Sequence, residues 1–184
     1  MSQTEFVGSS RRFVEAGQQT GLDLVVLPVS GGGKPFAFLR TEFQETHGSF
    51  SPGAPRRIAY SSDESGVPEV YVQAYTPGQA ASGARRQVSI GGGTMPRWRG
   101  DGKELYYLSL DHKMMAASVK TDSPFFQNSA PEVLFTSPVM APAAYYWTYD
   151  VTRDGRRFLL AESAAEAESQ PLTLVTNWQA AAKR

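Results

Sequence analysis

The sequence predicts an all-β protein made of repeated antiparallel sheets, and two observations support this prediction. Short segments rich in β-branched and aromatic residues alternate with turns rich in Gly, Pro, Asp and Ser along the 184-residue chain. One phrase also recurs: an apolar residue, a polar turn, a basic or polar pair, and an apolar strand. A strand, a turn and a second strand in this order are typical of a β-hairpin.

The spacing of the recurring phrase predicts a β-propeller. The copies begin at Phe50, Trp98 and Val151, which lie 48 and 53 residues apart. Propeller blades repeat every ~40 to 50 residues, and each blade is a four-stranded antiparallel sheet. We therefore expect a partial β-propeller of about three to four blades, formed by residues 1–184 as a single unit.

The blades are expected in four segments along the chain. Two complete blades are predicted at 47–90 and 94–137, and incomplete blades at 11–40 and 145–178. In the first incomplete blade, the second, third and fourth strands are expected in RRFVEA (11–16), LDLVVLPV (22–29) and KPFAFLRT (34–41). In the last blade, PLTLVTNW (171–178) is expected to be the third strand, and AESAAEAES (161–169) a loop despite its helical composition.

Glycine marks the turns between these strands. Asp101-Gly102 and Asp154-Gly155 predict two-residue type I′ hairpin turns, because that turn needs positive φ at both central residues. In the first copy Gly53-Ala54-Pro55 takes this place, so a longer hairpin is expected. Gly91-Gly92-Gly93 is expected to connect two blades, since glycine tolerates backbone angles that other residues avoid.

The phrase FSPGAPRRIAYSSDESGVPEVYV (50–72) resembles the repeat of TolB-like, WD-repeat-related bacterial propellers. PRWRGDGKELYYL (96–108) and YDVTRDGRRFLL (149–160) resemble two further copies, and the resemblance covers about residues 11–178. It implies the last blades of a large bacterial protein, and some such proteins carry a Ser/Thr kinase before the propeller. It also implies a periplasmic or extracytoplasmic location if the chain is part of such a protein.

Composition and charge argue against several other classes of protein. Lys+Arg and Asp+Glu are both 18, and the arginine pairs are scattered, so no nucleic-acid partner is expected. The absence of cysteine excludes disulfides, Cys-ligated metals and thiol nucleophiles. No apolar run approaches the ~20 residues of a membrane span, and the first residues lack a signal-peptide pattern, so neither is expected in this sequence.

The sequence offers no recognisable catalytic motif. Gly33-Lys34 and Gly102-Lys103 are not followed by the Ser or Thr of a phosphate loop. His47-Gly48-Ser49 misses the spacing of a nucleophile elbow, although a triad depends on the fold and sequence alone does not exclude one. The two histidines and the separated aspartates lack the spacing of a metal site. We expect no catalytic residue, no metal and no cofactor.

The best candidates for binding are residues that enter the innermost strands, because these segments converge at the mouth of a propeller channel. They are Glu45-Thr46-His47, Thr94-Met95-Pro96-Arg97 and Tyr145-Tyr146-Trp147. The three consecutive aromatic residues of the last segment cannot all face one side of a strand. We expect His47, Arg97, Tyr146 and Trp147 to bind a protein or peptide. In the alternative, Arg97 only pairs with Asp150 and the aromatic residues are buried.

The expected function is that of a non-catalytic β-propeller segment that mediates protein or peptide interaction. The remaining blades of a parent propeller, or further copies of the chain at open sheet edges, are additional expected partners. The alternative is the sensory or ligand-binding end of a larger enzyme, such as a receptor-like Ser/Thr kinase or a propeller-gated peptidase.

Overall fold

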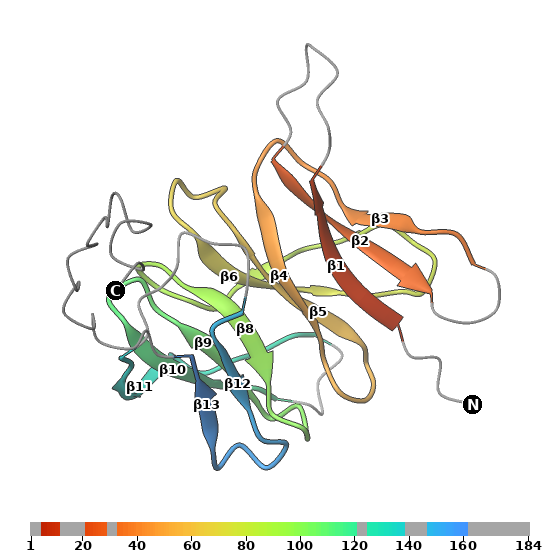
Figure 1. Cartoon of the computed structure of the whole chain (residues 1–184). Helices are drawn as coiled ribbons and strands as arrows, with labels where there is room; N and C mark the ends of the chain where they lie inside the picture. Colours follow the sequence, from red (N-terminus) through yellow and green to blue (C-terminus); the bar gives the residue numbers. More distant parts are fainter. Residues whose placement is uncertain (1–4, 12–20, 29–32, 121–124, 139–146, 162–184) are drawn as a thin grey trace, which may run out of the picture.

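The protein is all-β, as the sequence predicts. A computed structural model describes residues 5–11, 21–28, 33–120, 125–138 and 147–161, and in these residues every regular element is a β-strand. The strands form four antiparallel sheets (Figure 1). In the part of the chain that the structure describes, no helix is long and apolar enough to cross a membrane.

The first sheet has three strands in the order β1 (Glu5–Arg11), β2 (Leu22–Pro28) and β3 (Phe36–Leu39). Its first strand begins earlier than expected, because the antiparallel register pairs Arg11 with Leu22 and places the connection after Arg11. Residues 12–16 of the expected strand lie outside the described residues, as do 171–178.

Two four-stranded sheets follow, and both keep their strands in chain order. The second sheet contains β4 (Glu45–Phe50), β5 (Arg57–Ser62), β6 (Glu69–Ala74) and β7 (Arg86–Gln87). The third sheet contains β8 (Thr94–Trp98), β9 (Glu104–Leu108), β10 (Lys113–Ser118) and β11 (Glu132–Thr136). The fourth sheet consists of β12 (Tyr149–Val151) and β13 (Phe158–Leu160) among the described residues.

Each pair of successive sheets encloses a hydrophobic core. The first core joins the first and second sheets through Leu24, Phe38 and Tyr60, among others. The second core joins the second and third sheets and includes Val72, Trp98 and Tyr107. The third core joins the third and fourth sheets and includes Tyr106, Met114 and Tyr149. The sheets therefore pack face to face in the order in which the chain forms them (Figure 1).

The Asp-Gly turns differ from the expected type I′ geometry. In the β8–β9 connection the N–H of Gly102 donates to the carbonyl of Arg99 at 2.9 Å, and of the Asp101-Gly102 pair only Gly102 has positive φ. The N–H of Gly155 donates in the same way to Thr152 at 2.8 Å in the β12–β13 connection. The two-residue prediction is wrong because each Asp side chain accepts a backbone N–H two residues later, which favours a longer turn.

Two of the three segments expected to enter the innermost strands as loops, 45–47 and 94–97, belong to strands themselves, while Trp147 of the third precedes β12. His47 lies in β4 and Met95 in β8, and both have positive φ, 52° and 57°. The pairing register shifts at both places, between Thr46 and Ser49 and between Thr94 and Arg97. These irregularities are β-bulges, which bend a strand and redirect its side chains while the ladder continues.

Candidate functional site

Three of the four residues predicted to bind lie together. The ring centroids of His47 and Trp147 are 5.1 Å apart in an edge-to-face arrangement of 80°. The Cζ atom of Arg97 lies 3.7 Å from the centroid of the Trp147 ring. Tyr146 lies outside the described residues. The cluster of His47, Arg97 and Trp147 is called the Trp147 cluster below.

The Trp147 cluster forms where the first strands of three successive sheets meet (Figure 1). His47 comes from β4, Arg97 from β8, and Trp147 stands two residues before β12. His47 and Arg97 lie within or directly after the bulges of their strands. The bulges therefore set the direction from which these side chains approach Trp147.

Hydrogen bonds beneath the cluster hold the β8 bulge in its left-handed conformation. The N–H of Met95 donates to Oγ of Ser61 at 3.2 Å, and the hydroxyl of Tyr149 donates to the carbonyl of Met95 at 2.6 Å. Thr94 Oγ1 lies 3.3 Å from Nδ1 of His47. Positive φ is uncommon for residues other than glycine and persists when surrounding contacts over-determine it, as they do here.

Arg97 is only weakly paired with Asp150, the partner that the alternative interpretation names. Nε of Arg97 lies 3.7 Å from Oδ1 of Asp150, which is too long for a hydrogen bond. This Nε is buried and has no hydrogen-bond partner among the described residues. Oδ1 of Asp150 accepts the N–H of Val151 at 2.9 Å, and the side chain is 65% exposed. The ring of Trp147 is therefore the closest support of the guanidinium.

Two hollows open on either side of Arg97 and Asp150, which line both. The larger has a volume of about 430 Å³ and is also lined by Trp147, Thr148, Tyr149, Leu159, Leu160 and Ala161. The smaller has a volume of about 240 Å³ and is also lined by Ser49, Phe50, Ser51, Pro52, Trp98, Arg99, Gly100 and Val151. His47 is buried, whereas Trp147 is half-buried and Arg97 is 30% exposed. The cluster thus reaches from the interior to the surface.

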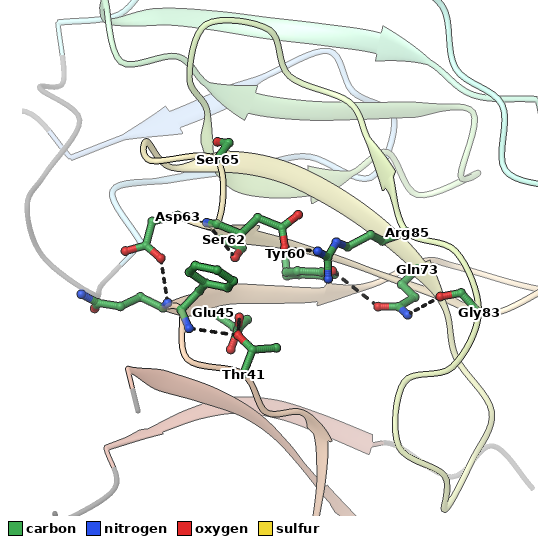
Figure 2. Close-up of polar contacts among 12 residues, drawn as sticks. Thr41, Glu45, Tyr60, Ser62, Asp63, Ser65, Gln73, Gly83 and Arg85 are labelled. Atoms are coloured by element: carbon green, nitrogen blue, oxygen red, sulfur yellow. Dashed lines mark hydrogen bonds and ion pairs between the residues drawn. The ribbon is translucent and has the colours of Figure 1, made fainter. Parts of the chain in front are cut away.

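A second polar cluster lies between the first and second sheets, around Glu45 (Figure 2). The hydroxyl of Thr41 donates to Oε1 of Glu45 at 2.5 Å, and Oε2 is buried without a hydrogen-bond partner among the described residues. Burial raises the pKa of the Glu45 carboxyl from 4.5 to about 7, although the Thr41 hydrogen bond opposes this. The negative charges of Asp23, Asp63 and Glu64 raise the pKa further.

Sequence reasoning named Glu45 only as part of a loop and missed the buried carboxyl group. The available signal is the two-residue period of a strand, which places Glu45 on the same face as the inward-pointing His47. The raised pKa depends chiefly on burial in the folded protein and further on carboxylates from distant parts of the sequence, so no local pattern indicates it. Within the described ranges, no group of three or more His, Asp or Glu side chains is placed to hold a metal ion.

Comparison of the sequence with protein-family models finds no match, and comparison with curated proteins finds none either.

Proposed function

We propose that the chain is part of a β-propeller that binds a protein or a peptide at the Trp147 cluster and catalyses no reaction there. Three features support the propeller. The sheets keep their strands in chain order, they pack face to face through successive cores, and the first strands of the second, third and fourth sheets meet. In a propeller, the innermost strands of the blades surround the central channel in this way.

The observation that carries the binding proposal is the stacking of Arg97 on Trp147 at the wall of the larger hollow. A guanidinium and an indole together offer a cation, hydrogen-bond donors and apolar surface in a small area. Arg and Trp are enriched among the residues that contribute most to protein interfaces. His47 has its Nδ1 directed at the hydroxyls of Thr46 and Thr94, at 3.0 and 3.3 Å, so we assign it a role in positioning Trp147.

A peptide-display experiment tests this proposal. A library of random peptides displayed on phage is selected against the chain, and the enriched peptides are synthesised and titrated against purified variants. We expect Trp147→Ala and Arg97→Gln each to weaken binding about tenfold or more, as substitution of a dominant interface residue does. Phe125→Ala is the matched control, because Phe125 is 76% exposed and lines neither hollow.

Thermal unfolding of each variant separates loss of binding from loss of fold. Enriched peptides that bind folded Trp147→Ala and Arg97→Gln as tightly as the unchanged chain would contradict the proposal. Selection that enriches no peptide at all would contradict it as well.

A further inference from the structure

We propose that the two hollows bind an extended peptide segment with an acidic side chain on Arg97 and, two positions away, an apolar side chain in the larger hollow. The inference rests on the proposed function and specifies its ligand. It follows from the shared lining of the hollows, from the partly exposed guanidinium of Arg97 stacked on Trp147, and from the apolar residues of the larger hollow.

The arrangement of the hollows favours an extended chain that crosses Arg97. Both hollows are lined by Arg97 and Asp150, so a segment that occupies both can contact these two side chains where the hollows adjoin. In an extended chain, side chains at positions i and i+2 point to the same side and lie about 6.6 Å apart. If the ligand side chain at position i contacts Arg97, the side chain two positions away in either direction can therefore enter one of the two hollows.

Arg97 is suited to a carboxylate. Its guanidinium is stacked on the Trp147 ring, its side chain is 30% exposed, and its contact with Asp150, at 3.7 Å, is too long for a hydrogen bond. Arginine presents planar paired donors that match the two oxygens of a carboxylate. Because the group is already oriented, little side-chain freedom is lost when a ligand carboxylate binds.

Charge beyond the smaller hollow supports an acidic segment. Arg99 and Gly100 also line a third hollow, together with Asp101, Arg153, Asp154 and Arg156. The carboxylates there are engaged: Asp101 accepts hydrogen bonds from Arg99, and Asp154 accepts them from Thr152 and from the N–H of Arg156. The lining of the third hollow thus contains three arginines and two aspartates, and among the described residues Arg153 and Arg156 form no ion pair within 4.0 Å.

The larger hollow supplies the apolar contact. Leu159, Leu160 and Ala161 line it opposite Arg97, and the side chain of Leu159 is 74% exposed. An apolar ligand side chain that enters here removes this surface and part of Trp147 from water, which is favourable in proportion to the area covered. The expected ligand pattern is therefore an Asp or Glu with an apolar residue two positions away.

Defined peptides test the inference. The probe is a fluorescein-labelled peptide of Ser and Gly, capped at both ends, with one glutamate and one leucine two positions apart, made in both orders. Fluorescence polarisation against the whole chain measures its affinity. We expect replacement of the glutamate by glutamine to weaken binding about tenfold, because a charge-assisted hydrogen bond becomes a neutral one. Replacement of the leucine by serine is expected to weaken it similarly.

Protein variants locate the effect. In Arg97→Gln the glutamate and glutamine peptides are expected to bind equally, and in Arg97→Lys an intermediate preference for glutamate is expected. Arg86→Gln is the matched control, since Arg86 is exposed on β7 and lines none of the three hollows. It is expected to keep the full preference. Both Arg97 variants are compared with the unchanged chain by thermal unfolding.

The outcomes separate this inference from the proposed function. If the glutamine peptide binds the unchanged chain as tightly as the glutamate peptide, and Trp147→Ala weakens both, the acidic ligand is wrong while the peptide site stands. If neither probe binds but the display peptides do, the inferred pattern is wrong. If no probe and no display peptide binds, both proposals are wrong.

Discussion

At the scale of single residues, Glu45 is a carboxyl group that the fold removes almost completely from water. It is 1% exposed, and its pKa is raised to about 7, chiefly by burial. Between about pH 4.5 and pH 7 the folded protein holds a proton on Glu45 that the unfolded chain has released. The free energy of unfolding contributed by this group therefore falls as the pH rises through this range and levels off above it.

We predict that Glu45→Gln removes this dependence, because glutamine resembles the protonated carboxyl group. The free energy of unfolding of the variant minus that of the unchanged chain is expected to increase by up to about 3 kcal/mol between pH 4.5 and pH 8. This follows from the shift of the pKa from 4.5 to about 7, at about 1.4 kcal/mol per pKa unit. Urea unfolding at a series of pH values measures it. Glu42→Gln, at an exposed position three residues earlier, serves as the control. Parallel stability curves for Glu45→Gln and the unchanged chain would show that folding does not shift the pKa of Glu45.

At the scale of elements, strands were predictable and bulges were not. Short runs of β-branched and aromatic residues, bounded by turns that contain Gly or Pro, indicate β5, β6 and β9 directly. In the bulges at His47 and Met95 the residue with positive φ is not a glycine, so the usual sequence signal for this conformation is missing. At Met95 the conformation is held by hydrogen bonds from Ser61 and Tyr149, which are far away in the sequence.

The candidate site was predictable as a group but not in its contacts. His47, Arg97 and Trp147 were grouped because each lies at or just before the first strand of its expected blade, and the structure brings them together. The sequence left open whether Arg97 pairs with Asp150 or serves binding. The stacking on Trp147 depends on how two sheets are oriented, which no local pattern encodes.

The contact between the β8–β9 and β12–β13 turns is predicted to maintain the geometry of the Trp147 cluster. The N–H of Gly100 donates to the carbonyl of Arg153 at 2.9 Å, and a Cβ at Gly100 would lie 2.7 Å from that oxygen. Gly100→Ala is therefore expected to separate the turns, lower the stability by about 1–3 kcal/mol and weaken peptide binding. Urea unfolding and fluorescence polarisation measure the two effects.

Gly91→Ala provides the comparison for that variant. Gly91 has φ of 76° but an added Cβ would meet no atom within 4 Å, so only backbone strain of about 1 kcal/mol is expected, with binding unchanged. If Gly100→Ala binds the peptide as tightly as Gly91→Ala does, the turn contact does not shape the site.

At the scale of the whole molecule, the outer strand of the third sheet carries exposed apolar side chains. Among the described residues β11 pairs only with β10, and its Val133 and Leu134 are 53% and 45% exposed. An apolar strand with one unpaired edge favours pairing with another chain. We predict self-association that increases with concentration in light scattering, and we expect Val133→Lys to reduce it because charge on an edge strand opposes pairing.

Ile90→Lys is the control for this prediction, since Ile90 is 78% exposed but lies outside the strands. Equal reduction by both substitutions would indicate general apolar association rather than pairing at the β11 edge. A monomer over the whole concentration range would contradict the prediction.

The central claim, that the Trp147 cluster binds peptide, is tested most directly by NMR of the tryptophan indole N–H groups. The Trp147 signal is assigned by its loss in Trp147→Phe, and the signal of Trp98, whose indole donates to the carbonyl of Ser49 at 3.1 Å, by its loss in Trp98→Phe. During titration with a display-selected peptide, the Trp147 signal is predicted to shift saturably with the dissociation constant found by polarisation, with a smaller shift for Trp98. A saturable shift of Trp98 with no change at Trp147 would contradict the account.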